Sequence, residues 1–226
     1  MTTHPPTSAL LAHSTRFWDK TARKYAASTV ADMVGYEHTL QRVRLRLHPT
    51  DRVLELGSGT ATTALRLAPA TAHYTAADLS PAMVDIARQK LKDAPPDVHR
   101  MLHLVVADAD AHLPAPAPAP VGWQGTCLPE AASQTAEGWD TVLAFNLLHL
   151  VPDLDHTLAQ VLRHLRPGGL FISKTPCVGQ MNPLVPHVAL PVLRLLRIAP
   201  PMHVLTEDQL LTAIERSGLT IDSVEH

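Results

Sequence analysis

Short apolar runs alternate with longer amphipathic segments through most of the chain. The apolar runs span residues 51–57, 73–78, 101–107, 139–145 and 170–174. A short, mostly apolar run that ends at a glycine, as at 51–57, is typical of a parallel strand buried on both faces of a sheet. The segments between and after them are predicted to be helices, at 60–68, 81–91, 152–165 and 206–217. This alternation predicts an α/β protein with a doubly wound, mostly parallel sheet between two layers of helices, a three-layer α/β/α fold.

Capping residues support two of these helices. Ser80 is a favourable N-cap, and Pro81 suits the first helical position after it. Thr206 and Gln209 have the spacing of a capping box, and Gly218 provides a stop at the other end of the same helix. The helix boundaries are therefore expected near these residues.

The chain is expected to have an N-terminal helical part and a larger core. Apolar and aromatic residues at helical spacing predict two helices between Leu10 and His48, where Pro49 follows. We therefore assign residues 1–48 to an N-terminal helical cap and residues 49–226 to the α/β core.

Two inserts interrupt the regular pattern of the core. Residues 111–138 contain the run PAPAPAP and predict a long, proline-stiffened loop. Residues 175–205 are apolar and broken by prolines, with a short helix expected at 188–198. The second insert is an acceptor-pocket cap, a dimer surface or packing against the sheet. A tight turn is expected at 167–169, and a sixth strand at 219–224.

Composition narrows the class of protein. Of 226 residues, 46% are hydrophobic and 18% charged, which is typical of a folded domain, and no run approaches the roughly eighteen apolar residues of a membrane span. The net charge of −2 gives no overall attraction to nucleic acid. Two cysteines are too few for a disulfide framework or a four-thiolate zinc site, and no signal-peptide layout precedes the first helix. We expect a cytoplasmic protein without a metal site; a homodimer is left open.

Glycines and acids follow the first three predicted strands. The first strand leads into Gly57 and Gly59, the second ends at Asp78, and the third is followed by Asp108. In an open parallel sheet, ligands bind beyond the carboxyl ends of the strands. The glycines allow the backbone to approach a ligand, and a carboxylate about 20 residues further on is placed to accept both hydroxyls of a ribose. The pattern therefore indicates a site for a nucleoside.

Glu55 bears on the charge of that ligand. It stands two residues before Gly57 and would repel the pyrophosphate of a dinucleotide. A cationic ligand fits better, and S-adenosylmethionine combines an adenosine with a sulfonium and an ammonium group and has no phosphate. Thr62, where a dinucleotide loop would have its third glycine, points the same way.

With these features the chain resembles the class I S-adenosylmethionine-dependent methyltransferases, in particular the small-molecule branch that includes the ubiquinone and menaquinone biosynthesis methyltransferases. The resemblance runs from about Phe17 to the end and rests on VLELGSGTA, TAADLSPAMVDIAR, VVADA, WDTVLAFNLLHLV, LRPGGLFISKTP and LTEDQLLTAIERSGL. It implies the Rossmann-like fold of that family. The family's antiparallel final strand is expected to be missing, because the sequence reaches His226 after only a sixth-strand segment; whether this end is native is left open.

The resemblance also implies which residues bind the cofactor. Asp78 would bind the ribose hydroxyls, Glu55 would lie under the methionine part, and Tyr25 would close over the cofactor. The third glycine of the loop is Ala61 here, a departure that is tolerated if the position serves packing. The implied cofactor-binding residues are Tyr25, Glu55, Gly57, Ser58, Gly59, Asp78, Leu79, Asp108, Ala109, Phe145, Asn146 and Leu147.

Methyl transfer from a sulfonium is an in-line displacement. It requires a nucleophile held about 3–3.5 Å from the methyl carbon in a dry pocket, and no metal ion. His149, after the fourth strand, is the candidate general base. Alternatively, His149 only orders the loop at the start of the next helix.

The expected function is methyl transfer to a small, apolar or aromatic acceptor. A nucleic-acid or protein methyltransferase is disfavoured by the slightly acidic charge and by AFNLLH after the fourth strand, where base-modifying enzymes have an Asn/Asp-Pro-Pro-aromatic signature. A nicotinamide-dependent oxidoreductase is disfavoured by Glu55. A non-catalytic partner protein that binds S-adenosylmethionine remains open.

Overall fold

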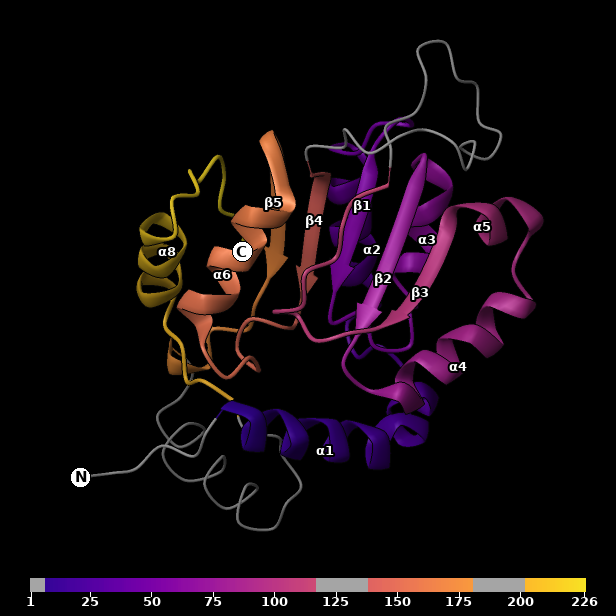
Figure 1. The fold of residues 1–226 in the computed structure, drawn as a ribbon, viewed down its shortest axis with the longest axis horizontal. Helices are drawn as coiled ribbons and strands as arrows, with labels where there is room; N and C mark the ends of the chain where they lie inside the picture. The colour runs from indigo at the N-terminus through magenta and orange to yellow at the C-terminus, as the bar shows by residue number, and fades with distance from the viewer. Residues whose placement is uncertain (1–6, 117–137, 181–201) are drawn as a thin grey trace.

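A five-stranded parallel sheet forms the centre of the molecule in the computed structural model, which describes residues 7–116, 138–180 and 202–226 (Figure 1). The strands stand in the order β3-β2-β1-β4-β5, and every neighbouring pair is parallel. They are β1 (Arg52–Leu56), β2 (His73–Asp78), β3 (Leu102–Val106), β4 (Trp139–Phe145) and β5 (Leu165–Lys174). The strand order reverses direction between β1 and β4, so the doubly wound α/β fold is confirmed.

Helices cover both faces of the sheet, as Figure 1 shows. One face packs on α2 (Met33–Arg44), α3 (Ala64–Leu67), α4 (Pro81–Lys92) and α5 (Pro96–Met101), and the other on α6 (Leu154–His164) and α8 (Glu207–Arg216). Two short 3-10 helices, η1 (Ala68–Ala70) and η2 (Val178–Gln180), complete the described elements. Successive residues of β1 serve opposite faces: Val53 belongs to one apolar cluster and Leu54 to the other. No helix in the described ranges is long and apolar enough to cross a membrane.

The first helix, α1 (Thr7–Ala27), lies across the carboxyl ends of the strands and contacts α4 (Figure 1). Asp19 fastens it there, because its Oδ1 accepts hydrogen bonds from the Ser80 hydroxyl (2.6 Å) and the Ala82 N–H (3.1 Å). Ser80 is also the N-cap of α4, where its side chain accepts from the Met83 N–H, as predicted. Helix α1 thus covers the edge at which the predicted site lies.

Most predicted elements are confirmed within two residues, and the capping box of Thr206 and Gln209 is present. The helix predicted at 60–68 is shorter, because the chain stays in a loop up to Thr63. Helix α5 was not predicted. The turn at 167–169 lies inside β5, as a bulge between its pairings with Trp139 and Thr141.

The sixth strand predicted at 219–224 is wrong, since this segment has no strand structure. It is held by ion pairs instead of a strand ladder: Arg46 pairs with Asp222 at 3.0 Å, and Arg42 pairs with Glu225. Arg42 belongs to α2, and Arg46 follows two residues after its end. The described sheet therefore has five strands, all parallel. The short helix expected at 188–198 lies outside the described residues.

Candidate functional site

The loop after β1 has the backbone conformation that its glycines predict. Gly57 and Gly59 have φ angles of +67° and +56°, in the left-handed region that glycine adopts without strain. Gly57 is also restricted by space, because a Cβ atom there would lie 2.7 Å from Leu147 Cδ1. Leu147 follows β4, so the loops after β1 and β4 are in direct contact. A side chain at position 57 would be strained by this backbone conformation and would force Leu147 to move.

Ala61 occupies a more demanding position than the sequence suggests. It is fully buried, which agrees with the expected packing role, but its φ is +56°. A left-handed backbone costs a non-glycine residue about 1–2 kcal/mol. The loop also receives support from α4, where Lys90 Nζ donates to the Thr60 and Thr62 hydroxyls at 2.8 and 2.9 Å. The third glycine position is thus a strained packing position in this chain.

Asp78 connects the end of β2 to the glycine loop. Its Oδ2 accepts from the Gly59 N–H at 2.7 Å, and its Oδ1 accepts from the Ser80 N–H at 2.9 Å. Burial raises the pKa of the Asp78 carboxyl, and these two backbone N–H groups act against that shift. These two hydrogen bonds join the acid to the glycine loop, while its binding of a ribose stays a prediction.

Glu55 is buried in the middle of the sheet. Its Oε2 accepts a hydrogen bond from the Tyr74 hydroxyl at 2.9 Å, across the β1–β2 pair. Burial is the main cause that raises the pKa of Glu55 to about 8; the Tyr74 hydrogen bond lowers it, and nearby Asp78 raises it further. The carboxyl is therefore largely protonated at pH 7. This corrects the expectation from the sequence that an ionised Glu55 repels a pyrophosphate.

Tyr25 reaches the glycine loop from α1. A Cβ atom on Gly59 would lie 3.7 Å from Tyr25 Cε1, so the ring lies over that glycine. Tyr25 is half exposed. The buried part of its ring raises the pKa of the phenol, and the charges of Asp78 and Glu55 raise it further, which places the phenol close to both acids. Trp18 packs edge-on against the ring, with 6.1 Å between centroids. The structure thus brings Tyr25, Glu55, Gly59 and Asp78 together.

Residues after β2 and β3 extend the same edge of the sheet. Leu79 is partly exposed beside Asp78, and Ala109 is buried after β3. Asp108 is partly exposed, and its Oδ1 accepts from the Asp110 N–H at 3.3 Å. Ser58 contributes through its backbone, whose N–H donates to the Ala77 carbonyl at 3.0 Å. These residues form one side of the candidate site.

The residues after β4 form the other side. Asn146 has a φ of +53°, and its N–H donates to the Lys174 carbonyl of β5 at 2.7 Å. Phe145 and Leu147 are partly buried on either side of it. His149 is 7% exposed, and its Nδ1 has no hydrogen-bond partner among the described residues. Burial is the main cause that lowers the pKa of His149 to about 4, with His203 a second cause, so the imidazole is neutral at pH 7.

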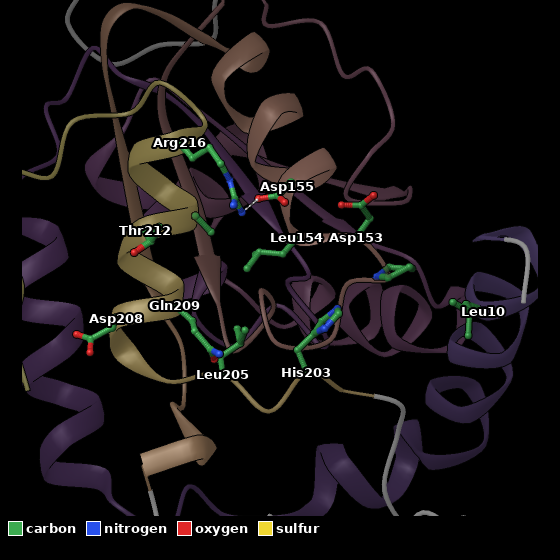
Figure 2. Close-up of a pocket in the computed structure, with 12 residues that line it drawn as sticks. Leu10, Asp153, Leu154, Asp155, His203, Leu205, Asp208, Gln209, Thr212 and Arg216 are labelled. Atoms are coloured by element: carbon green, nitrogen blue, oxygen red, sulfur yellow. Dashed lines mark hydrogen bonds and ion pairs between the residues drawn. The ribbon is translucent and has the colours of Figure 1, made fainter. Parts of the chain in front are cut away.

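A cleft opens beside this second side, between α6, α8 and the start of α1 (Figure 2). Its volume is about 680 Å³, and Leu10, Leu154 and Leu205 are among its apolar lining. Arg216 and Asp155 form an ion pair of 2.6 Å across part of it, visible in Figure 2. His203 also lines it and joins it to the β4–α6 loop, because the His203 N–H donates to the His149 carbonyl at 2.6 Å.

Sequence reasoning missed this cleft, because its residues come from distant segments without a motif. It lies toward the opposite end of α1 from Tyr25: Leu10 and Tyr25 are separated by about 22 Å of helix. In the described ranges, no cluster of three or more histidine, cysteine or acidic side chains could hold a metal ion.

Comparison with known proteins gives a family match and several structural relatives. The family model described as a methyltransferase domain matches residues 54–171. A highly reducing polyketide synthase of Cordyceps militaris is 30% identical over 151 residues, which cover 63% of this chain and 5% of the synthase. A reducing polyketide synthase of Preussia isomera is 27% identical over 127 residues, 55% of this chain and 5% of that protein. The chain thus spans about a twentieth of the length of these relatives.

Two solved structures show the same fold. An S-adenosylmethionine-dependent methyltransferase of Thermotoga maritima has a TM-score of 0.60 and 18% identity, over 90% of this chain and 80% of that one. A second such enzyme, of Mesorhizobium loti, has a TM-score of 0.60 and 22% identity, over 83% of this chain and 82% of that one.

Proposed function

The chain belongs to the class I S-adenosylmethionine-dependent methyltransferases, and we propose that it transfers the methyl group to a small, apolar or aromatic acceptor by in-line displacement. S-adenosylmethionine is the cofactor of this family and supplies, when bound, an electrophilic methyl group on a sulfonium. The convergence of Tyr25, Gly59 and Asp78 on one loop carries the assignment of the cofactor site. The likeness to the ubiquinone and menaquinone branch stays a prediction.

The residues at the glycine loop suit a cationic nucleoside. Asp78 uses one lone pair of each oxygen for a backbone N–H, which leaves acceptor capacity for the two ribose hydroxyls. Leu79, Asp108 and Ala109 would border the adenine. Glu55 would lie beneath the methionine part, where a nearby cation favours the ionised carboxylate. Cofactor binding is therefore expected to release a proton from Glu55.

The second side of the site would hold the reacting end. Phe145, Asn146 and Leu147 would line the methionine end, and Tyr25 would exclude water from above. The main contribution of the chain is to hold the acceptor in line and keep the pocket dry. His149 stays a candidate for general base, but a group with a pKa of about 4 is a weak base at neutral pH. Orientation of the acceptor is the role that its burial favours.

The cleft beside the second side of the site is large enough for a small molecule, although His149 itself does not line it. A volume of about 680 Å³ is in the range of small-molecule sites, and the cleft adjoins the loop that carries His149. The polyketide synthase relatives add polyketide-type compounds to the acceptors worth testing. A cytoplasmic location and a homodimer stay predictions from the sequence.

Calorimetry with S-adenosylmethionine and with NADH tests the cofactor assignment. We expect binding of S-adenosylmethionine, and a loss of at least tenfold in affinity for Asp78→Asn. The matched control is Asp85→Asn, because Asp85 is an exposed acid on α4 that pairs only with Arg88 among the described residues. Binding of NADH without binding of S-adenosylmethionine would refute the proposal. Transfer of a labelled methyl group to an acceptor panel then separates an enzyme from a non-catalytic partner.

A further inference from the structure

Two buried polar atoms at the carboxyl ends of β4 and β5 have no hydrogen-bond partner among the residues that the structure describes. They are Nδ1 of His149 and Oγ1 of Thr175. Native proteins pair the large majority of their buried polar groups, so an unpaired one calls for a physical explanation such as a bound ligand. Two such atoms after neighbouring strands strengthen that explanation.

The two residues follow neighbouring strands: Thr175 comes directly after β5, and His149 comes four residues after β4, which pairs with β5. Phe145 of β4 is in register with Lys174 of β5, so Thr175 directly follows the last paired residue. Lys174 points toward α2, where its Nζ donates to the Thr39 hydroxyl at 3.1 Å. Strand alternation, carried one residue further, therefore places Thr175 on the opposite face, which packs on α6. His149 follows Leu148, which is buried on that same face.

The surroundings of this region are apolar. Leu148 packs in one cluster with Phe171 of β5 and with Cys177, two residues beyond Thr175. Leu158 and Leu205 belong to the same cluster. A hydroxyl and a neutral imidazole offer hydrogen bonds without a net charge. A carboxylate or an ammonium group would find no opposite charge on either of these side chains, and its desolvation would oppose binding.

We propose that His149 and Thr175 are the polar contacts of the acceptor site and that they select an acceptor with a neutral oxygen, such as a carbonyl, enol or hydroxyl, on an apolar body. The proposal rests on the methyl transfer proposed above and names its substrate class. Thr175 is then a specificity-determining residue. The sequence gives no signal for it, because a single threonine after a strand forms no motif.

Stability without ligand tests whether the Thr175 hydroxyl is unpaired. We expect Thr175→Val to leave Tm within about 2 °C of the wild type or to raise it, because no hydrogen bond is lost. Thr157→Val is the matched control, since Thr157 is fully buried and its hydroxyl donates to Asp110 at 2.7 Å. That variant is expected to lower Tm by about 2–6 °C. An equal fall in both variants would overturn the proposal, because the Thr175 hydroxyl would then already have a partner.

Binding of three probes with one ring tests the substrate class. Benzyl alcohol, benzylamine and benzoate are titrated by NMR into protein saturated with S-adenosylhomocysteine. We expect benzyl alcohol to bind most tightly and Thr175→Val and His149→Phe each to weaken it about fivefold to tenfold. Thr175→Ser, which keeps the hydroxyl, should restore binding, and the affinity for S-adenosylhomocysteine should not change.

Three results would overturn the proposed acceptor class: tightest binding of a charged probe, unchanged binding of benzyl alcohol by Thr175→Val, or no binding of any probe. Failure of the wild type to bind S-adenosylhomocysteine is a different result. It would refute the proposed function itself, so the two failures are distinguishable.

Discussion

Replacement of Glu55 by glutamine tests whether a buried carboxyl in β1 stays protonated at neutral pH. The pKa of Glu55 is raised from 4.5 to about 8 in the folded protein, chiefly by burial. The native state therefore keeps a proton that the unfolded chain releases above pH 4.5. For such a group the contribution to stability is greatest below pH 4.5 and is lost as the pH rises to about 8.

The magnitude follows from the shift. Each pKa unit corresponds to about 1.4 kcal/mol, so the loss is about 3 kcal/mol at pH 7 and about 5 kcal/mol above pH 8. Glutamine has nearly the same shape, cannot ionise, and can accept the hydrogen bond from the Tyr74 hydroxyl. The free energy of unfolding of Glu55→Gln, relative to the wild type, should therefore rise by about 1.4 kcal/mol per pH unit between pH 5 and 8.

Urea unfolding of the cofactor-free protein at pH 5, 6, 7, 8 and 9 measures this difference. Other titrating groups are shared by both proteins, so they cancel in the comparison. Glu37→Gln is the control, because Glu37 is exposed and Arg66 lowers the pKa of its carboxyl. Any change with pH in its stability relative to the wild type should therefore have the opposite sign. A difference between Glu55→Gln and the wild type that stays constant from pH 5 to 8 would refute the reasoning.

Three further predictions concern the loops around the site. Gly57→Ala should lower the free energy of unfolding by about 2–4 kcal/mol in urea unfolding. Gly168→Ala is the control: φ there is +72°, but the nearest atom to an added Cβ is 3.9 Å away, so the loss should be only about 1–2 kcal/mol. Equal losses in the two variants would exclude the clash with Leu147. By the same measurement, Ala61→Val should lower the free energy of unfolding by more than about 2 kcal/mol, since a branched side chain cannot adopt φ +56° without strain. Ala61→Gly should lower it by less than about 1 kcal/mol. The reverse order would contradict the left-handed conformation. The neutral form of His149 stabilises the fold above pH 6.5, and this contribution is lost as the pH falls to about 4. The free energy of unfolding of His149→Gln should therefore fall less steeply with decreasing pH than that of the wild type. An unchanged pH dependence would argue against a buried imidazole.

Much of the fold was predictable because buried parallel strands leave a local pattern. The strands at 73–78 and 139–145 match the structure at both ends, since each is a short segment of strand-forming residues with a clear boundary. The bulge at 167–169 and the missing strand at 219–224 were not, because both depend on partners. Strand alternation in the last segment carries no information about whether a neighbouring edge is free. Here Arg42 of α2 and Arg46 just after that helix bind the segment instead.

The candidate site was predictable where the chemistry lies in one short motif. The link between Gly59 and Asp78 follows from spacing and strand order. The protonation of Glu55 and the unpaired hydroxyl of Thr175 do not, because burial and missing partners are properties of the assembled structure. The sequence treated Glu55 as an ionised acid beside a loop, whereas the structure shows an acid inside a sheet.

The bond between Asp19 and the start of α4 has a consequence for cooperativity. The sequence suggested a division between residues 1–48 and 49–226, but Asp19 accepts hydrogen bonds from Ser80 and Ala82, on the far side of that boundary. Detachment of α1 would take a hydrogen-bond partner from the residue that caps α4. The two parts are therefore expected to melt as one unit, with a single calorimetric transition whose van't Hoff and measured enthalpies agree.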